Sequence, residues 1–204
     1  MKKLLCLSLS IFFLATLFAQ PKIIADGTIT YSIIHSDNAE QDDLGAKTIY
    51  LKGKDVRVDL TSKRFTQSIF YSGNTGDVTV LKTIGQSKYI SFYNAEKWKK
   101  QNEVYNGIKT TLTNNTKKIL EYDCKQAILN LTNGDSSVVY YVPSIKPLMA
   151  ENAFEFKDVP GLILEYESSA KGKQKVIYVA TKVDFDPVPT IQFEIPKKGY
   201  RLLE

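Results

Sequence analysis

The feature that most constrains the fold is an alternation of apolar and polar residues along many short segments of the chain. Ile29, Tyr31 and Ile33 are separated by single hydroxyl residues, and the segment Val56 to Leu60 alternates apolar with charged residues. Successive side chains of a β-strand point to opposite faces, so each segment places its apolar side chains together on one face. Both segments therefore predict strands that are buried on one face and solvated on the other.

Further segments have a strand-like composition and are separated by short polar breaks. These segments are residues 67–71, 78–84, 88–93, 118–122, 125–131, 137–142, 162–167, 175–183 and 191–195. Gly53, Gly85, Asn133-Gly134 and Ala170-Lys171-Gly172 supply turn residues beside them. Because short turns join neighbouring strands as antiparallel hairpins, the pattern favours a meander.

Three segments interrupt the strand pattern. Residues 94–106 are predicted to form a short surface helix with Asn94 as its N-cap. Residues 114–116 are predicted to be a loop, and residues 143–152 a loop or a short helix. With no internal repeat or change in composition, residues 20–204 are expected to form one domain. We expect a mainly β fold, either a single curved antiparallel sheet or half-barrel of roughly ten strands with one or two short helices, or two packed sheets.

The amino terminus resembles a secretory signal peptide. Lys2 and Lys3 are followed by an apolar run from Leu4 to Phe18 and then by the small residue Ala19. The run is shorter than the roughly 20 residues that span a bilayer. We therefore predict that residues 1–19 are removed, that no stable membrane span remains, and that the product is periplasmic or secreted.

Composition narrows the function classes. Without Lys2 and Lys3 the chain has 25 basic and 22 acidic residues, and they are scattered, which argues against a nucleic-acid partner. Cys124 is the one cysteine after residue 19, so neither an intramolecular disulfide nor a cysteine metal site is expected. Free cysteines are usually buried, and we expect the same of Cys124.

The residues that carry most enzyme chemistry are scarce. His35 is the single histidine, and its polar neighbours predict a solvated loop. A Gly-x-Ser-x-Gly motif and a Gly-rich phosphate loop are both missing from the sequence. The carboxylate pairs Asp184/Asp186 and Glu165/Glu167 are predicted to lie on the wet sides of strands. We therefore expect no enzyme activity, no cofactor and no metal site.

Aromatic and aliphatic residues in the predicted strands are the remaining candidates for a site. One face of a curved sheet could hold an apolar ligand, or the same side chains could fill an ordinary core. The candidate lining residues are Tyr31, Ile33, Val58, Phe70, Phe92, Tyr140 and Leu164.

One motif resembles a known family. The segment Asp158-Val159-Pro160-Gly161-Leu162-Ile163 resembles the Gly-Leu-Pro-Gly-Leu-Ile signature of the GLPGLI family of exported Bacteroidota proteins, and its last four residues match. Residues 118–127 and 140–145 resemble two further stretches of that family. The resemblance implies an envelope protein without an assigned activity. Its layout is similar to lipoprotein-carrier domains, in which an antiparallel half-barrel shelters an acyl chain.

The motif also has a physical interpretation of its own. Pro160 fixes φ and Gly161 permits a turn with positive φ, so we predict a structural turn that opens the strand at Leu162. In that strand we expect Leu164 to be buried and Glu165 to be exposed.

Two functional hypotheses follow. The first is an exported, non-enzymatic binding protein whose partner is a lipid or another apolar small molecule. The alternative is a structural or interaction module of the envelope with a fully packed core, whose partner is another envelope protein.

Overall fold

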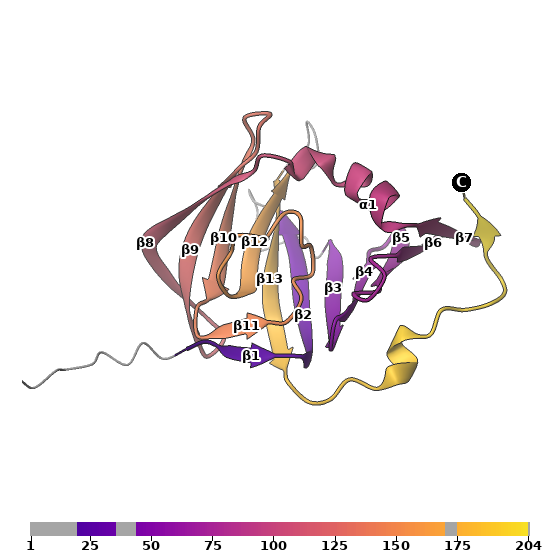
Figure 1. The fold of residues 1–204 in the computed structure, drawn as a ribbon, viewed down its shortest axis with the longest axis horizontal. Coiled ribbons are helices and arrows are strands. Elements are labelled where there is room, and N and C mark those ends of the chain that lie inside the picture. The colour runs from indigo at the N-terminus through magenta and orange to yellow at the C-terminus, as the bar shows by residue number, and fades with distance from the viewer. Residues whose placement is uncertain (1–19, 36–43, 170–174, 204) are drawn as a thin grey trace, which may run out of the picture.

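The computed structural model describes residues 20–35, 44–169 and 175–203. The predicted signal peptide, residues 1–19, and the predicted turn Ala170-Lys171-Gly172 lie outside these residues. Within the described residues, the chain forms one α-helix, two short 3₁₀ helices and fourteen strands (Figure 1). They are β1 (Lys22–Ile24), β2 (Asp26–His35), β3 (Gly45–Lys52), β4 (Asp55–Thr61), β5 (Phe65–Tyr71), β6 (Val78–Ile84), β7 (Ser87–Tyr93), α1 (Ala95–Gln101), 3₁₀ Glu103–Tyr105, β8 (Lys109–Ile119), β9 (Tyr122–Asn130), β10 (Ser136–Val142), β11 (Ile145–Pro147), β12 (Leu162–Ser169), β13 (Lys175–Asp184), 3₁₀ Thr190–Phe193 and β14 (Arg201–Leu202).

Twelve of the strands form one large curved sheet that is not closed into a barrel (Figure 1). Its order is β14-β7-β6-β5-β4-β3-β2-β13-β12-β10-β9-β8. Every neighbouring pair is antiparallel except β14 and β7, which are parallel. The predicted mainly β class with a curved antiparallel sheet is confirmed.

The sheet consists of two meanders that meet at β2 and β13. Strands β2 to β7 each pair with the next along the chain, as do β8, β9 and β10, followed by β12 and β13. The turn Asn133-Gly134 between β9 and β10 forms as predicted, with Gly134 at φ 91°. β2 joins the two halves, and its Tyr31 is opposite Lys47 of β3 and Ala180 of β13.

One face of the sheet is covered by the chain between β11 and β12. The alternation predicted for β2 is confirmed, because Ile29, Tyr31 and Ile33 are buried on this face. The segment 148–161 crosses this face in front of β13 and β2 (Figure 1). Its start is fixed by the parallel pair β1 and β11, and the Leu148 amide donates to the Ile24 carbonyl at 2.8 Å.

The carboxyl-terminal segment runs along the opposite face. Arg57 of β4 donates through Nη1 to the Gln192 carbonyl at 2.6 Å, and Lys52 of β3 donates to the Val188 carbonyl at 2.6 Å. The predicted strand 191–195 is wrong, because Thr190–Phe193 form a 3₁₀ helix. Pro189 precedes that helix, and proline has no amide hydrogen to donate to a ladder.

Four other predicted boundaries are wrong. Residues 114–116 lie within β8, where the register with β9 shifts, and are not a loop. The predicted strand 118–122 contains the turn between β8 and β9, with Leu120 at φ 53°. Residues 143–152 contain β11, and the predicted helix 94–106 ends at Gln101 before a 3₁₀ turn. Asn94 caps the helix as predicted, accepting from the Lys97 amide at 2.9 Å.

The placement of three chemically active residues is informative. Cys124 is fully buried as predicted, and burial raises the pKa of its thiol to about 11, which disfavours the reactive thiolate. His35 is the last residue of β2 rather than a loop residue, opposite Val176. Glu165 is buried, contrary to the prediction, and its carboxylate pairs with Lys117 Nζ at 2.6 Å.

Candidate functional site

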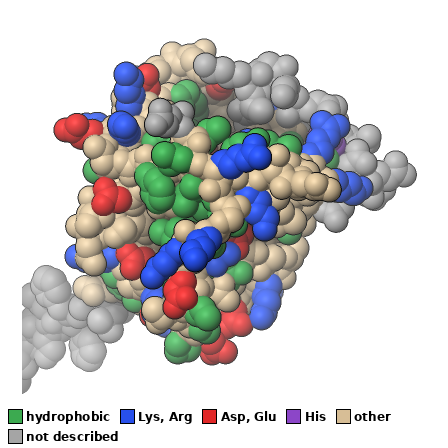
Figure 2. Space-filling view, turned by 90° about the vertical axis from the view of Figure 1, so that its right-hand side faces the viewer, with side chains coloured by type: hydrophobic (Ala, Val, Ile, Leu, Met, Phe, Trp, Pro, Cys, Tyr) green, Lys and Arg blue, Asp and Glu red, His purple; other side chains and the backbone are tan. Residues whose placement is uncertain are grey.

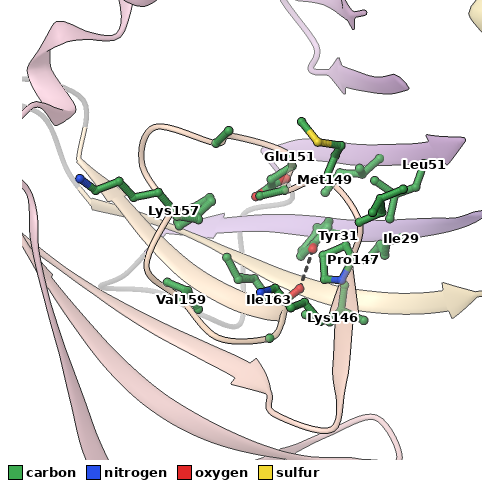
Figure 3. Close-up of a pocket in the computed structure, with 17 residues that line it drawn as sticks. Ile29, Tyr31, Leu51, Lys146, Pro147, Met149, Glu151, Lys157, Val159 and Ile163 are labelled. Atoms are coloured by element: carbon green, nitrogen blue, oxygen red, sulfur yellow. Dashed lines mark hydrogen bonds between the residues drawn. The ribbon is translucent and has the colours of Figure 1, made fainter. Parts of the chain in front are cut away.

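A cavity of about 330 Å³ lies between the segment 146–163 and the strands β2 and β3 (Figure 3). Its lining is mostly apolar. The lining residues are Ile29, Tyr31, Ile49, Leu51, Lys146, Pro147, Leu148, Met149, Ala150, Glu151, Ala153, Phe156, Lys157, Val159, Gly161, Leu162 and Ile163. A concave, mostly apolar space with a few polar groups is typical of a binding site for a small molecule.

The motif that carries the family resemblance forms part of this cavity wall. Val159, Gly161, Leu162 and Ile163 all line the cavity. The Tyr31 hydroxyl donates to the Ile163 carbonyl at 2.8 Å, the dashed line in Figure 3, and this bond ties the motif to the centre of the sheet. The motif therefore shapes the cavity as well as opening β12.

Gly161 is required for a reason other than the one predicted. Its φ is not in the positive range, so the left-handed conformation that glycine permits is not used here. A Cβ at Gly161 would instead lie 2.3 Å from the Val142 carbonyl oxygen and 2.7 Å from Tyr141 Cδ2. Glycine is needed because the backbones of Gly161 and β10 approach too closely for any side chain.

A buried ion pair lies beside the cavity. Lys47 of β3 is on the covered face of the sheet, and its Nζ is 2.5 Å from Oε2 of Glu151. The side chains of Lys47 and Glu151 are only 11% and 6% exposed. Charges buried to this degree are retained only when each is paired, so the pair fixes the segment 148–161 to the sheet.

Three tyrosines surround the Lys47 ammonium. Lys47 Nζ donates to the Tyr166 hydroxyl at 2.6 Å and lies 4.9, 5.3 and 5.8 Å from the ring centroids of Tyr166, Tyr178 and Tyr31. The rings of Tyr166 and Tyr178 are stacked with centroids 4.6 Å apart. Ring faces attract a cation, so these tyrosines offset part of the free-energy cost of taking the Lys47 ammonium out of water.

Burial and the Glu151 carboxylate act together on these tyrosines. Burial raises the pKa of Tyr31, Tyr166 and Tyr178 above the ordinary value, and the charge of Glu151 raises it further. The three hydroxyls are therefore neutral hydrogen-bonding groups at physiological pH.

A second carboxyl group, Glu155, lies on the segment 148–161, which covers one face of the sheet and is called the covering segment below. Burial raises the pKa of Glu155 to about 7, and the Glu151 carboxylate adds to the effect. Lys47, the Tyr105 hydroxyl and Asn152 oppose this shift, and Asn152 Nδ2 lies 3.3 Å from the Glu155 carboxylate. Glu155 thus changes protonation near neutral pH.

Replacing Glu155 with glutamine is expected to stabilise the protein at pH 8 and to give no gain at pH 4. The raised pKa means that the folded state holds a proton that the unfolded state releases above about 4.5. The stability that the protonated Glu155 side chain contributes to the folded state is thus fully present below about pH 4.5. It is lost as the pH rises through about 7. We expect a gain on the order of 2 kcal/mol in the free energy of unfolding at pH 8, measured by urea denaturation.

The exposed carboxylate of Glu103 provides the control for that measurement. Glu103→Gln should change the free energy of unfolding at pH 8 by less than about 0.5 kcal/mol, as surface substitutions usually do. The assignment is contradicted if Glu103→Gln stabilises the protein as much as Glu155→Gln does. It is also contradicted if Glu155→Gln changes the free energy of unfolding by the same amount at pH 8 as at pH 4.

A second cavity of about 210 Å³ lies on the other side of the ion pair. Strands β4 and β5, helix α1 and the segment 150–154 enclose it, and Ala150, Glu151 and Ala153 line both cavities. The remaining lining residues of the second cavity are Lys47, Val56, Val58, Ile69, Tyr71, Trp98, Asn102, Asn152 and Phe154. The pair of Lys47 and Glu151 therefore stands at the wall between the two spaces.

The residues expected to line a ligand are divided between the two faces. Tyr31 lines the first cavity, Val58 lines the second, and Ile33 is buried on the same face. The register places Phe70 and Phe92 on the opposite face, where Phe70 packs against Arg57 and Phe92 is exposed.

Tyr140 and Leu164 lie outside both cavities. Tyr140 accepts a hydrogen bond from Gln126 Nε2 at 2.9 Å, and its ring faces the Lys117 ammonium. Leu164 is fully buried in the main core cluster, which also contains Cys124. Alternation identified buried positions, but it could not decide which face the covering segment occupies.

The charged residues of the site were not anticipated. Lys47 belongs to a strand that was not predicted, and Glu151 lies in a segment expected to be a loop or short helix. Among the described residues, no group of three or more His, Cys, Asp or Glu is placed to hold a metal ion. In the same part of the chain, no helix has both the length and the hydropathy needed to cross a bilayer.

Comparison with known proteins supports the fold alone. No protein-family profile and no curated protein match the chain. Two crystal forms of PNGF-II are similar, with TM-scores of 0.54 and 0.51, 12% and 13% identity, and 88% and 86% of this chain covered. The chain spans only 31% and 30% of PNGF-II.

A LolA superfamily protein, NE2245 from Nitrosomonas europaea, is more distant. Its TM-score is 0.34 and its identity 11%, over 83% of this chain and 90% of NE2245. A likeness at that level supports no argument. The resemblance to the GLPGLI family accordingly stays a prediction from the motif.

Proposed function

We propose that the chain is a non-enzymatic binding protein of the bacterial cell envelope, periplasmic or secreted after removal of residues 1–19, and a member of the GLPGLI family. Its ligand is a lipid or another apolar small molecule, held in the cavity beneath the segment 146–163. The observation that carries the proposal is this mostly apolar cavity, closed on one side by β2 and β3 and on the other by the tethered segment.

The size of the cavity limits the ligand. Ligand pockets usually enclose about 300 to 1,000 Å³, and a space of about 330 Å³ is at the lower end of this range. It suits one short acyl chain or a compact apolar molecule rather than a whole two-chain lipid. The charged residues that line it are Lys146, Lys157 and Glu151, and Glu151 is paired with Lys47. The rest of the lining is mostly apolar, so apolar contacts would supply most of the affinity.

The alternative, an envelope interaction module with a fully packed core, is less well supported. Two cavities adjoin the covering segment, so the covered face of the sheet is incompletely filled. Protein interiors are normally packed to near-crystalline density. Space of this size beneath a tethered segment favours a ligand over a packed core.

Filling the cavity tests the proposal. Ile49 lines the cavity, and Ile49→Phe should reduce the affinity for dansyl-labelled undecanoic acid about tenfold, equivalent to about 1.4 kcal/mol. Leu81→Phe is the matched control, since Leu81 is buried on the opposite face and lines neither cavity. Fluorescence titration of the protein purified after export measures both.

The result can contradict the proposal in two ways. Equal loss of affinity in Ile49→Phe and Leu81→Phe would place the probe outside the cavity. A parent protein that binds no probe, and that carries no small molecule in native mass spectrometry, would contradict ligand binding itself.

A further inference from the structure

A group of exposed apolar side chains lies where the carboxyl-terminal segment meets β7. Phe92 and Leu202 are 58% and 60% exposed, and Ile195 and Leu203 are also exposed. Phe92, Ile195 and Leu202 line a shallow hollow of about 480 Å³ with Ile90, Pro196 and Tyr200. Figure 2 shows apolar side chains gathered on this side of the molecule. Single exposed apolar residues are normal, but a contiguous group indicates an interaction surface.

Backbone contacts hold these side chains in place. Arg201 and Leu202 pair with Tyr89 and Ile90, and the Leu203 amide donates to the Ile90 carbonyl at 2.8 Å. Ser91 Oγ donates to the Leu203 carbonyl at 3.0 Å. The exposed side chains are therefore presented by a segment fixed to the edge of the sheet.

Basic side chains adjoin the same hollow. Lys197 and Lys198 line it, Lys88 Nζ lies 6.0 Å from the Tyr200 ring centroid, and Arg201 is exposed in β14. In the part of the chain that the structure describes, none of these four cations takes part in an ion pair. The charged residues that line the hollow, Lys197 and Lys198, are both positive. The exposed acids Asp77, which lines an adjacent hollow with Phe92, and Glu194 lie in the same region. Figure 2 shows Lys and Arg side chains beside the apolar group.

We propose that this basic apolar face, formed by Phe92, Leu202, Leu203 and the four cations, docks onto the surface of an anionic lipid bilayer. Apolar side chains flanked by lysine and arginine bind at the headgroup boundary, where burial of the apolar groups and attraction to anionic lipids act together. Protein–protein interfaces are depleted in lysine, which makes a protein partner the weaker fit. The inference goes beyond the proposed ligand binding and does not depend on it.

The opposite edge of the sheet offers a matched control. Leu112 of β8 is 54% exposed, nearly as much as Leu202, and it has the exposed Lys109 nearby in the same strand. β8 and β14 are the two ends of the twelve-stranded sheet. Leu112→Asp therefore removes an equally exposed leucine far from the proposed docking face.

Flotation with lipid vesicles tests the proposal. The protein purified after export should float with vesicles of equal phosphatidylglycerol and phosphatidylcholine, and far less with pure phosphatidylcholine. Leu202→Asp and the double variant Lys197→Gln/Lys198→Gln should each lower the partition coefficient about tenfold, and Leu112→Asp should leave it unchanged. Added salt should weaken binding of the parent, because exposed charges are screened.

Several outcomes would overturn the proposal. They are no flotation of the parent, equal flotation with both vesicle types, or equal loss in Leu202→Asp and Leu112→Asp. A stable dimer of the parent that Leu202→Asp dissociates would assign the face to a second copy of the chain instead. Thermal melting of each variant checks that the exposed substitutions leave the fold intact, and the lysine variants keep the test valid if Leu202→Asp unfolds.

Discussion

Replacing Lys47 with methionine is expected to destabilise the protein by about 3 to 5 kcal/mol at pH 8. Lys47 is the cation paired with Glu151, and the side chains of both are almost completely buried. Apart from this ion pair, neither carboxylate oxygen of Glu151 has a hydrogen-bond partner within the described residues, so loss of Lys47 leaves an uncompensated buried charge. Urea denaturation of parent and variant measures the change in the free energy of unfolding.

The double variant Lys47→Met/Glu151→Met separates the charge from its packing. Replacing both members of a buried ion pair with apolar residues of similar size is often neutral, so we expect most of the lost stability to return. Lys182→Met is the surface control, because Lys182 and Asp184 form an exposed pair at 2.9 Å that contributes little. If Lys47→Met were as mild as Lys182→Met, the ion pair would not anchor the covering segment.

Replacing Gly161 with alanine is expected to cost about 3 kcal/mol and to lower the melting temperature by several degrees. The new methyl group would meet the Val142 carbonyl oxygen at 2.3 Å, and backbone atoms cannot move aside as a flexible side chain can. The same shift would disturb the wall of the first cavity, so binding of an apolar probe should weaken as well.

Gly85 provides the contrasting control for this substitution. Gly85 has φ +57° and open space where a Cβ would stand, with nothing within 4 Å, whereas Gly161 has ordinary φ and no space. Gly85→Ala should cost only the left-handed backbone penalty of about 1 to 2 kcal/mol. If Gly161→Ala has the same melting temperature as the parent, β10 and β12 must separate easily at this point. That result would contradict a structural role for the motif.

The strands that could be predicted are those with an uninterrupted apolar face or with a strand-like composition between turn residues. β2 and β4 alternate cleanly, because each lays apolar side chains against the core and polar ones on the other face. β5, β6 and β7 lack this alternation, and their strand-like composition and the turn residues between them predicted them instead. β3 was missed because Lys47 occupies a buried position where alternation requires an apolar residue. β8 was missed because it is the edge strand and is exposed on both faces along most of its length, which leaves no periodic signal.

The candidate site was only partly predictable for a related reason. Local patterning identified Tyr31 and Val58 as buried, and the two residues line the first and second cavities. The position of the covering segment depends on tertiary contacts, among them the pair of Lys47 and Glu151, that no local pattern records. A buried glutamate in an irregular segment has the same sequence appearance as a solvated one.

The pairing of β2 with β13, which joins the two meanders, affects how the chain folds. Thr181 Oγ1 donates to the Thr30 carbonyl, a residue 151 positions away. Loop-closure entropy grows only logarithmically, by about 0.6 kcal/mol for each doubling of length, so this distant pairing costs little at equilibrium. Its cost is kinetic, because contacts of high sequence separation slow folding. Each meander can form from local hairpins, but the curved sheet is complete only when the last long strand reaches the first.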